Sequence, residues 1–151
     1  KVARTWRTSG ADWLSDPMPV LQGWSPEDYV RCASMYDDVL GGSWPPLVGI
    51  GSVCRRAVNG PDGLLNIIDR LSSVLPTHVG MHLFGVKGSS LPKLNRRVVS
   101  IDSAAWQYRA RMEALKNSES CTIALKTKAM EHWYKKQTEL ALKSTEQTSM
   151  F

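Results

Sequence analysis

The sequence predicts an α/β protein in which parallel strands are joined by crossover helices. Between residues 19 and 112, short β-rich runs alternate with stretches of helical periodicity, the pattern of consecutive βα units. These runs are separated by helix start signals rather than by the tight turns of hairpins. Four units can be distinguished. Because a (β/α)8 barrel contains eight, the chain is expected to form half of a TIM-type barrel.

The first unit has the clearest signals. A strand is expected at residues 19–23, followed by a helix that Ser25 caps and that has Pro26 at its first position. Asp28 lies in the first turn, where the positive end of the helix dipole favours an acidic side chain. Two glycines at 41–42 should end this helix.

The other three units follow from similar signals. Residues 47–51 are apolar throughout, as in a parallel strand buried on both faces. Residues 79–86 alternate in a way that predicts a strand with Met81 and Leu83 on one face. The remaining elements are expected to be a helix from about residue 61 to the residue before Pro76, a helical turn at 91–94, a strand at 98–102 and a helix from 104 to about 115.

Three segments are expected along the chain. Residues 1–18 form an N-terminal arm or the remnant of an upstream element, and residues 19–116 form the half-barrel domain. Residues 117–151 form a C-terminal region with a long basic helix from Thr122 to about Leu142. An isolated half barrel leaves two sheet edges and an apolar interior open, so we expect a missing N-terminal barrel half or a partner chain.

Composition limits the partners and cofactors. Nineteen Lys and Arg against fourteen Asp and Glu give a net charge of +5, which favours polyanions, although solubilising helix faces explain it equally well. No apolar stretch approaches the ~20 residues of a membrane span and no leader is visible, so a cytoplasmic protein without a membrane partner is expected. The three cysteines form no CxxC pair, so no zinc and no other cofactor is expected.

The candidate binding residues lie where the predicted strands end, because ligands of parallel barrels bind at the carboxyl ends of the strands. The Gln22 amide suits the edge of a purine-like base, although it is equally suited to bonding local backbone. Glycines at these ends allow close approach of a ligand, but they also form turns. The candidate base-binding residues are Gln22, Gly23, Gly49, Gly51, Ser52, Phe84 and Gly85.

Cations near the same strand ends are candidates for holding a nucleic-acid backbone. Guanidinium groups can form two parallel hydrogen bonds to a phosphate. The alternative is that these cations are solvated charges at helix starts and on helix faces. The candidates are Arg55, Arg56, Lys87, Arg109 and Arg111.

Asp102 is the candidate catalytic residue. It ends the fourth strand, where a carboxylate can act as a nucleophile toward a sugar carbon. The alternative is that Asp102 caps the next helix, but Ser103 can do that instead. His82, within the third strand, is a secondary candidate, because a buried histidine with a hydrogen-bond partner is more common than a catalytic one.

The four strand ends together resemble motifs of the tRNA-guanine transglycosylase superfamily. Residues 22–28 resemble its "VQGG…ED" element, and residues 49–51 resemble its glycine-bearing "GGLAVGE" strand. Residues 83–88 resemble "YLMGVG", and residues 99–103 resemble "VDMFDCV". The order and approximate spacing match over residues 19–112. The resemblance therefore covers most of the predicted half barrel, and it assigns this half to the C-terminal side of the barrel.

Longer strings are more similar to the branch that places 7-deazapurines in the DNA of bacteria and phages. They are Val-Leu-Gln-Gly-Trp, Gly-Ile-Gly-Ser-Val-Cys-Arg-Arg, Phe-Gly-Val-Lys and Ile-Asp-Ser-Ala-Ala-Trp. The resemblance implies a pentosyltransferase, a base-exchanging glycosyltransferase that replaces guanine in DNA by a 7-deazaguanine derivative. It implies that Gln22 contacts the base and that Asp102 forms a covalent intermediate with the sugar.

Two departures from the superfamily pattern qualify this expectation. The zinc element of the tRNA enzymes has no counterpart here, which indicates either the zinc-free DNA branch or lost contacts to tRNA. The second carboxylate, which transfers the proton, lies in the other barrel half, so this chain is expected to be inactive by itself. The alternatives are a transglycosylase acting on tRNA, a non-catalytic nucleic-acid-binding fragment, and a different barrel enzyme that binds phosphate near Gly49 and Lys87.

Overall fold

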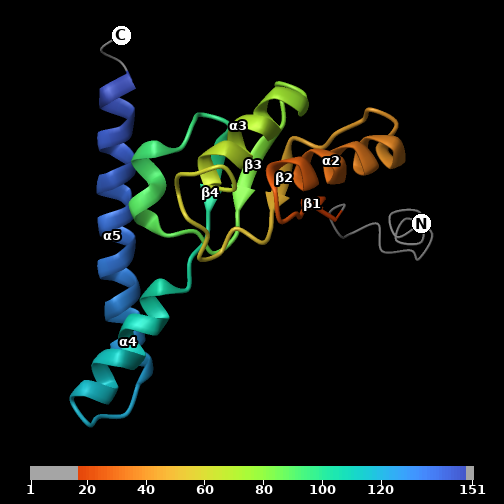
Figure 1. Ribbon diagram of the computed structural model, residues 1–151. Helices are drawn as coiled ribbons and strands as arrows, with labels where there is room; N and C mark the ends of the chain where they lie inside the picture. Colours follow the sequence, from red (N-terminus) through yellow and green to blue (C-terminus); the bar gives the residue numbers. More distant parts are fainter. Residues whose placement is uncertain (1–16, 149–151) are drawn as a thin grey trace.

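The computed structural model describes residues 17–148 and contains one four-stranded sheet (Figure 1). The strands are β1 (Val20–Leu21), β2 (Leu47–Ile50), β3 (Gly80–Leu83) and β4 (Val98–Ile101). Each pairs in parallel with the next, in the order β1-β2-β3-β4. The predicted parallel strands are therefore confirmed, and each is shorter than its predicted range.

Two helices lie on one side of the sheet, α2 (Pro26–Leu40) and α3 (Leu64–Val74) (Figure 1). The start of α2 is the predicted one: Ser25 accepts a hydrogen bond from the N–H of Asp28, and the Asp28 carboxylate accepts one from the N–H of Ser25. Gly41 ends this helix with a left-handed backbone at φ 60°. Helix α3 starts at Leu64, later than predicted, because Gly63 N–H closes a turn onto Gly60.

The hydrophobic core fills the space between these helices and the sheet. The cross-strand register places Leu21, Ile50 and Leu83 in one row, and all three are fully buried. They pack with apolar side chains of both helices, among them Tyr29 and Ile67. At about 25 cal/mol for each Å² of apolar surface removed from water, this layer supplies the main stabilisation of the fold.

The opposite face of the same strands is partly open to solvent and carries polar and aromatic side chains. Register places Gly49, His82 and Ser100 in one row, and Phe84 and Asp102 continue it toward the carboxyl ends of their strands. The His82 and Phe84 side chains are partly exposed, and Ser100 and Asp102 are exposed. The strands thus separate an apolar face from a polar one, because successive side chains point to opposite sides of a sheet.

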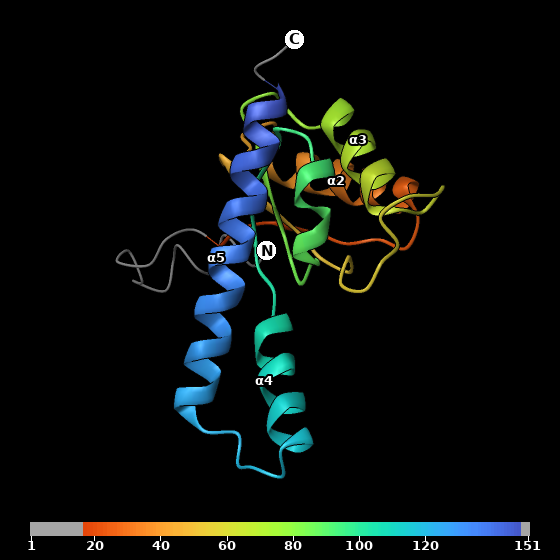
Figure 2. The ribbon, with the colours of Figure 1, turned by 90° about the vertical axis from the view of Figure 1, so that its left-hand side faces the viewer.

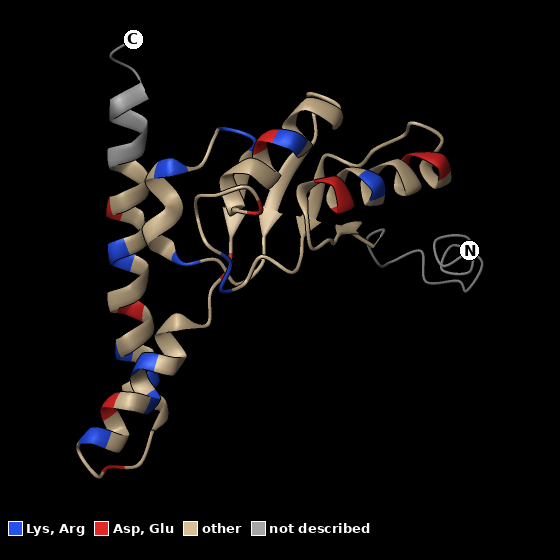
Figure 3. Ribbon diagram, in the orientation of Figure 1, with Lys and Arg blue, Asp and Glu red and all other residues tan. Residues whose placement is uncertain are grey.

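Beyond β3 the chain forms a short 3-10 helix, η1 (Gly88–Lys93), and beyond β4 two further helices. These are α4 (Ala105–Lys116) and α5 (Ile123–Thr148), which pack against each other as a hairpin that projects from the sheet (Figures 1 and 2). Helix α5 continues past Leu142, where the sequence-based prediction ended it. It carries acids as well as lysines (Figure 3).

Contacts with η1 hold α5 beside the sheet. Gly88 lies so close to Gln137 that a Cβ at this glycine would come within 1.4 Å of the Gln137 Oε1 atom. Most of the proposed N-terminal arm, residues 1–16, lies outside the described residues. None of the helices between residues 17 and 148 has the length and apolar character of a membrane span.

Candidate functional site

The carboxyl ends of the four parallel strands meet at one edge of the sheet, where Gln22 and Ser52 are in contact. The Ser52 hydroxyl donates a hydrogen bond to Gln22 Oε1 at 3.3 Å. A Cβ added at Gly51 would lie 3.0 Å from the Gln22 Cγ atom, so the absence of a side chain at Gly51 makes room for the Gln22 side chain. The Gln22 amide therefore sits beside the end of β2, with its NH2 group available as a donor.

Gly23 is required by the helix that follows. A Cβ at this position would come within 2.7 Å of the Asp28 side chain and 2.8 Å of the backbone nitrogen of Tyr29. The start of α2 thus packs directly against Gly23, and this contact fixes the position of the neighbouring Gln22 at the end of the sheet.

Asp102 occupies the end of β4 next to the loop after β3. Its carboxylate accepts a hydrogen bond from the backbone N–H of Gly85, and its own N–H donates to Leu83 O at 3.2 Å. Gly85 has a left-handed backbone, φ 69°, and a Cβ there would lie 3.0 Å from Cys54. The carboxylate is therefore oriented by the β3 loop, and it stays exposed at the edge.

The contacts at the start of α4 bear on the capping alternative for Asp102. The Ser103 hydroxyl accepts a hydrogen bond from the N–H of Ala105 at 3.3 Å. The residue at the cap position is Ala104, which has no capping side chain. Ser103 thus serves the first turn of α4, while the carboxylate of Asp102 binds the β3 loop.

Phe84 covers the polar face of the sheet near this edge. A Cβ at Gly49 would come within 2.6 Å of the Phe84 ring, so only glycine lets the ring lie against β2. The ring meets His82 edge-on, with centroids 4.6 Å apart at 75°. His82 Nδ1 lies 2.8 Å from the Ser100 hydroxyl. Phe84, His82 and Ser100 together form an aromatic and polar surface next to the strand ends.

A buried tyrosine and an arginine tie the loops of this edge together. The Tyr29 hydroxyl donates to Gly51 O at 2.7 Å, which joins α2 to the end of β2. Burial raises the pKa of Tyr29 above its ordinary value, and the neighbouring Arg56 guanidinium opposes this change. Tyr29 therefore stays protonated and keeps donating to Gly51. The sequence analysis missed this role because Tyr29 fits the apolar pattern of the helix, which does not show that its hydroxyl binds Gly51.

Arg56 differs from the other candidate cations. Its Nη1 donates to the carbonyl oxygens of Trp24 at 2.7 Å and Asp62 at 2.9 Å, and its Nη2 donates to Gly23 O at 3.3 Å. The guanidinium lies 5.8 Å from the centroid of the Trp24 ring. These contacts tie the loop after β1 to the loop after β2 at the carboxyl edge.

The other four candidate cations are exposed. Arg55 follows β2 and has a left-handed backbone at φ 66°, and Lys87 precedes η1. Arg109 and Arg111 lie on α4. The structure therefore divides the cations between the loops of the sheet edge and the helical hairpin.

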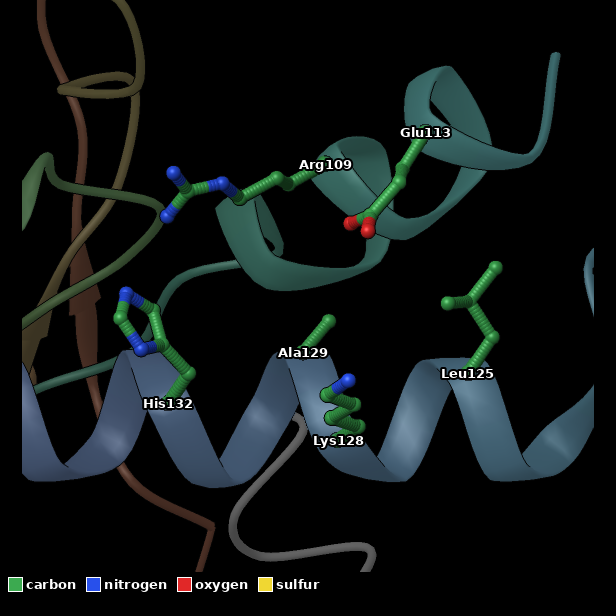
Figure 4. Close-up of a pocket in the computed structure, with 6 residues that line it drawn as sticks. All are labelled: Arg109, Glu113, Leu125, Lys128, Ala129 and His132. Carbon is green, nitrogen blue, oxygen red and sulfur yellow. The ribbon is translucent and has the colours of Figure 1, made fainter. Parts of the chain in front are cut away.

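A pocket of about 230 Å³ lies between α4 and α5. Figure 4 shows Glu113 and Lys128 pointing toward one another across it, with Arg109 and His132 at one end. The lining residues are Arg109, Glu113, Leu125, Lys128, Ala129 and His132. The hairpin thus adds a lysine and a histidine that the sequence analysis did not select, because they become neighbours of Arg109 only when the helices pair.

Within residues 17–148 there is no group of three or more His, Cys, Asp or Glu side chains arranged to hold a metal ion. Cys32, Cys54 and Cys121 are free thiols. The expected absence of zinc stays a prediction that elemental analysis of the purified protein can test.

Comparison with known proteins identifies the family. The searches of curated proteins and of solved structures gave no significant match. A family model described as "DpdA: DeoxyPurine in DNA protein A" matches residues 2–148, nearly the whole chain. This chain therefore belongs to the DpdA family.

Proposed function

We propose that this chain carries the nucleophile-bearing half of a transglycosylase that replaces guanine in DNA by a 7-deazaguanine derivative. The family description concerns deoxypurine in DNA, which favours DNA over tRNA as the substrate. The observation that carries the proposal is the position of Asp102. Its carboxylate lies exposed at the carboxyl edge of a parallel sheet, oriented by Gly85 and not used as a helix cap.

The reaction follows the logic of a retaining glycosidase. A carboxylate oxygen of Asp102 forms a bond to C1′ of the target nucleotide, while the bond from C1′ to the guanine nitrogen breaks. The departing base keeps the electron pair and takes up a proton. The incoming deazapurine loses a proton from the equivalent nitrogen, which then attacks C1′ and releases the carboxylate. Two displacements leave the sugar with its original configuration.

The base is proposed to bind between the ends of β1, β2 and β3. Gln22 presents an amide to the base edge, and by the resemblance to the transglycosylases the glycines at these strand ends line the pocket. Phe84 offers a ring against which a planar base can lie. The proposed pocket comprises Gln22, Gly23, Gly49, Gly51, Ser52, Phe84 and Gly85.

Strands β1 and β4 form the two edges of the described sheet. We propose that a further set of strands pairs with these edges to complete a (β/α)8 barrel, whose interior would be the polar face with Phe84 and His82. By its resemblance to the tRNA-guanine transglycosylase superfamily, that other half would contribute the carboxylate that transfers the proton.

Backbone contacts to DNA are proposed for the exposed cations, Arg55, Lys87, Arg109 and Arg111. Phosphate contacts place a nucleic acid without reading its sequence. Arg56 is proposed to act indirectly, since its guanidinium already holds the carbonyl groups of the site loops. A salt dependence of DNA binding that weakens when these exposed cations are replaced would support this assignment.

The test uses the full-length protein with Asp102→Asn and Ser103→Ala as matched variants. Asparagine keeps the size of the side chain but cannot displace the base, so the covalent protein–DNA adduct should disappear on denaturing gels and exchange should fall by orders of magnitude. Ser103→Ala should keep the adduct. Retention of the adduct by Asp102→Asn would place the nucleophile elsewhere. Formation of adducts on RNA but not on DNA would show that the substrate is RNA and not DNA.

A further inference from the structure

Trp24 is an exposed tryptophan at the edge that carries the proposed site. It follows Gln22 and Gly23 in the loop between β1 and α2, and 82% of it is exposed. Single exposed apolar side chains are common on protein surfaces and need no special explanation. Trp24 differs because its surroundings hold it in place while leaving the ring uncovered.

Both polar groups of the Trp24 backbone are bound. Its N–H donates to the Asp28 carboxylate at 3.1 Å, and its carbonyl accepts from Arg56 Nη1 at 2.7 Å. Asp28 is in turn fixed by the capping box of α2. The residue is therefore positioned by the start of a helix and by a guanidinium, rather than by burial of its own side chain.

The indole ring has a cation close by. The Arg56 guanidinium carbon lies 5.8 Å from the Trp24 ring centroid and 5.9 Å from that of Tyr29. Cations at this distance from a ring are attracted by its negative face. The exposed remainder of the ring is a flat apolar surface with a positive charge beside it, which suits a nucleic-acid base joined to a phosphate backbone.

Base exchange creates a need for such a surface. A stacked and paired nucleotide hides its glycosidic bond, so the target must leave the duplex before Asp102 can reach C1′. The bases beside it then lose a stacking partner. Two residues of chain span at most about 7 Å, and stacked nucleotides are spaced about 3.4 Å along a strand. Trp24 is thus within reach of a nucleotide adjacent to one bound at Gln22.

We propose that the Trp24 indole stacks on an unpaired DNA base next to the target nucleotide, with Arg56 supporting the ring. This inference rests on the proposed action on DNA. It adds a contact that holds opened DNA at the site, separate from the recognition of the exchanged base by Gln22.

The test measures binding of the full-length protein to a DNA duplex in which the target guanine lies opposite an abasic site and a neighbouring base is 2-aminopurine. Trp24→Phe keeps an aromatic ring and Trp24→Leu keeps only apolar bulk. Tyr134→Leu is the control, because Tyr134 is an aromatic residue of α5 that is 68% exposed. Thermal unfolding of every variant is recorded in parallel.

Trp24→Leu should weaken binding about 5- to 100-fold, the loss that one base–aromatic stacking contact implies. It should also restore 2-aminopurine fluorescence that wild type quenches, while the Phe variant and the Tyr134 control stay close to wild type. Unchanged binding by Trp24→Leu, or an equal loss in the Phe variant or the control, would overturn the inference. A fall in melting temperature with unchanged binding would also overturn it, because another part of the protein would then cover the ring.

The outcome is independent of the proposed chemistry. If wild type forms no covalent adduct while binding still depends on the ring of Trp24, the transglycosylase proposal fails and the stacking inference stands. If the adduct forms but binding does not depend on Trp24, the reverse holds.

Discussion

The two faces of the sheet are built from alternate residues of the same strands, yet they differ in almost every physical property. Leu83 is fully buried under the helices, whereas its neighbour Phe84 is partly exposed on the other face. Ile101 packs against the core, and the next residue, Asp102, is an exposed carboxylate. A shift of one residue in either strand would exchange the two sets.

This difference shows how the fold separates stability from chemistry. The helix-covered face contributes apolar burial, which has no directional requirement and tolerates similar side chains. The other face contributes oriented polar groups such as the His82–Ser100 pair, whose value lies in position. Substitutions on the first face should therefore change the free energy of unfolding, and substitutions on the second should change binding or catalysis.

The largest stability effect is expected for Leu83→Ala. The side chain is fully buried, so its removal loses apolar burial and leaves a cavity, at a cost of about 2–5 kcal/mol in the free energy of unfolding. Urea unfolding of the purified protein measures this. Val99→Ala on β4 is the control: Val99 is 61% exposed, and its truncation should cost about 0.5 kcal/mol or less. Equal losses at both positions would remove the distinction between the faces.

The adjacent arginines Arg55 and Arg56 should differ in the same way at the sheet edge. Arg56→Lys keeps the charge but loses the fork that binds several carbonyl oxygens, so we expect a destabilisation of about 1–3 kcal/mol in urea unfolding. Arg55→Lys should leave stability unchanged, because Arg55 is exposed. The contrary result, with Arg55 the costlier substitution, would contradict the holding role given to Arg56.

The smallest effect concerns Asp28, in the first turn of α2. Hydrogen bonds from the N–H groups of Ser25 and Trp24 lower the pKa of this carboxyl below its ordinary value of 3.8. A carboxyl whose pKa is lower in the folded state stabilises the fold above its unfolded pKa, and the contribution is lost as the pH falls through the folded pKa. The stability difference between wild type and Asp28→Asn should therefore shrink as the pH is lowered below about 3.8. A difference that stays constant in acid would show that the charge of Asp28 has no part in the cap.

Much of the fold could be predicted from local signals. The capping box at Ser25, the glycine stop at Gly41 and the alternation around Met81 each depend on a few neighbouring residues, and the structure shows all three. The start of α3 was placed too early, because residues 61–63 continue a turn whose closing hydrogen bond the sequence pattern does not reveal. The roles assigned to Gln22 and Asp102 stay predictions, although the structure brings both to the same edge.

The order of strands and helices, the alternation along the strands and the side chains available at each strand end all follow from local sequence. Which of these side chains come into contact depends on how the chain packs. Arg55 and Arg56 are equivalent as sequence, but among the described contacts only Arg56 binds carbonyl groups of the loop after β1. Trp24 is one of six tryptophans, and its position above Arg56 depends on β2 lying beside β1. Periodicity and caps act over one or two turns of chain, whereas these contacts join residues about thirty positions apart and form only when the sheet assembles.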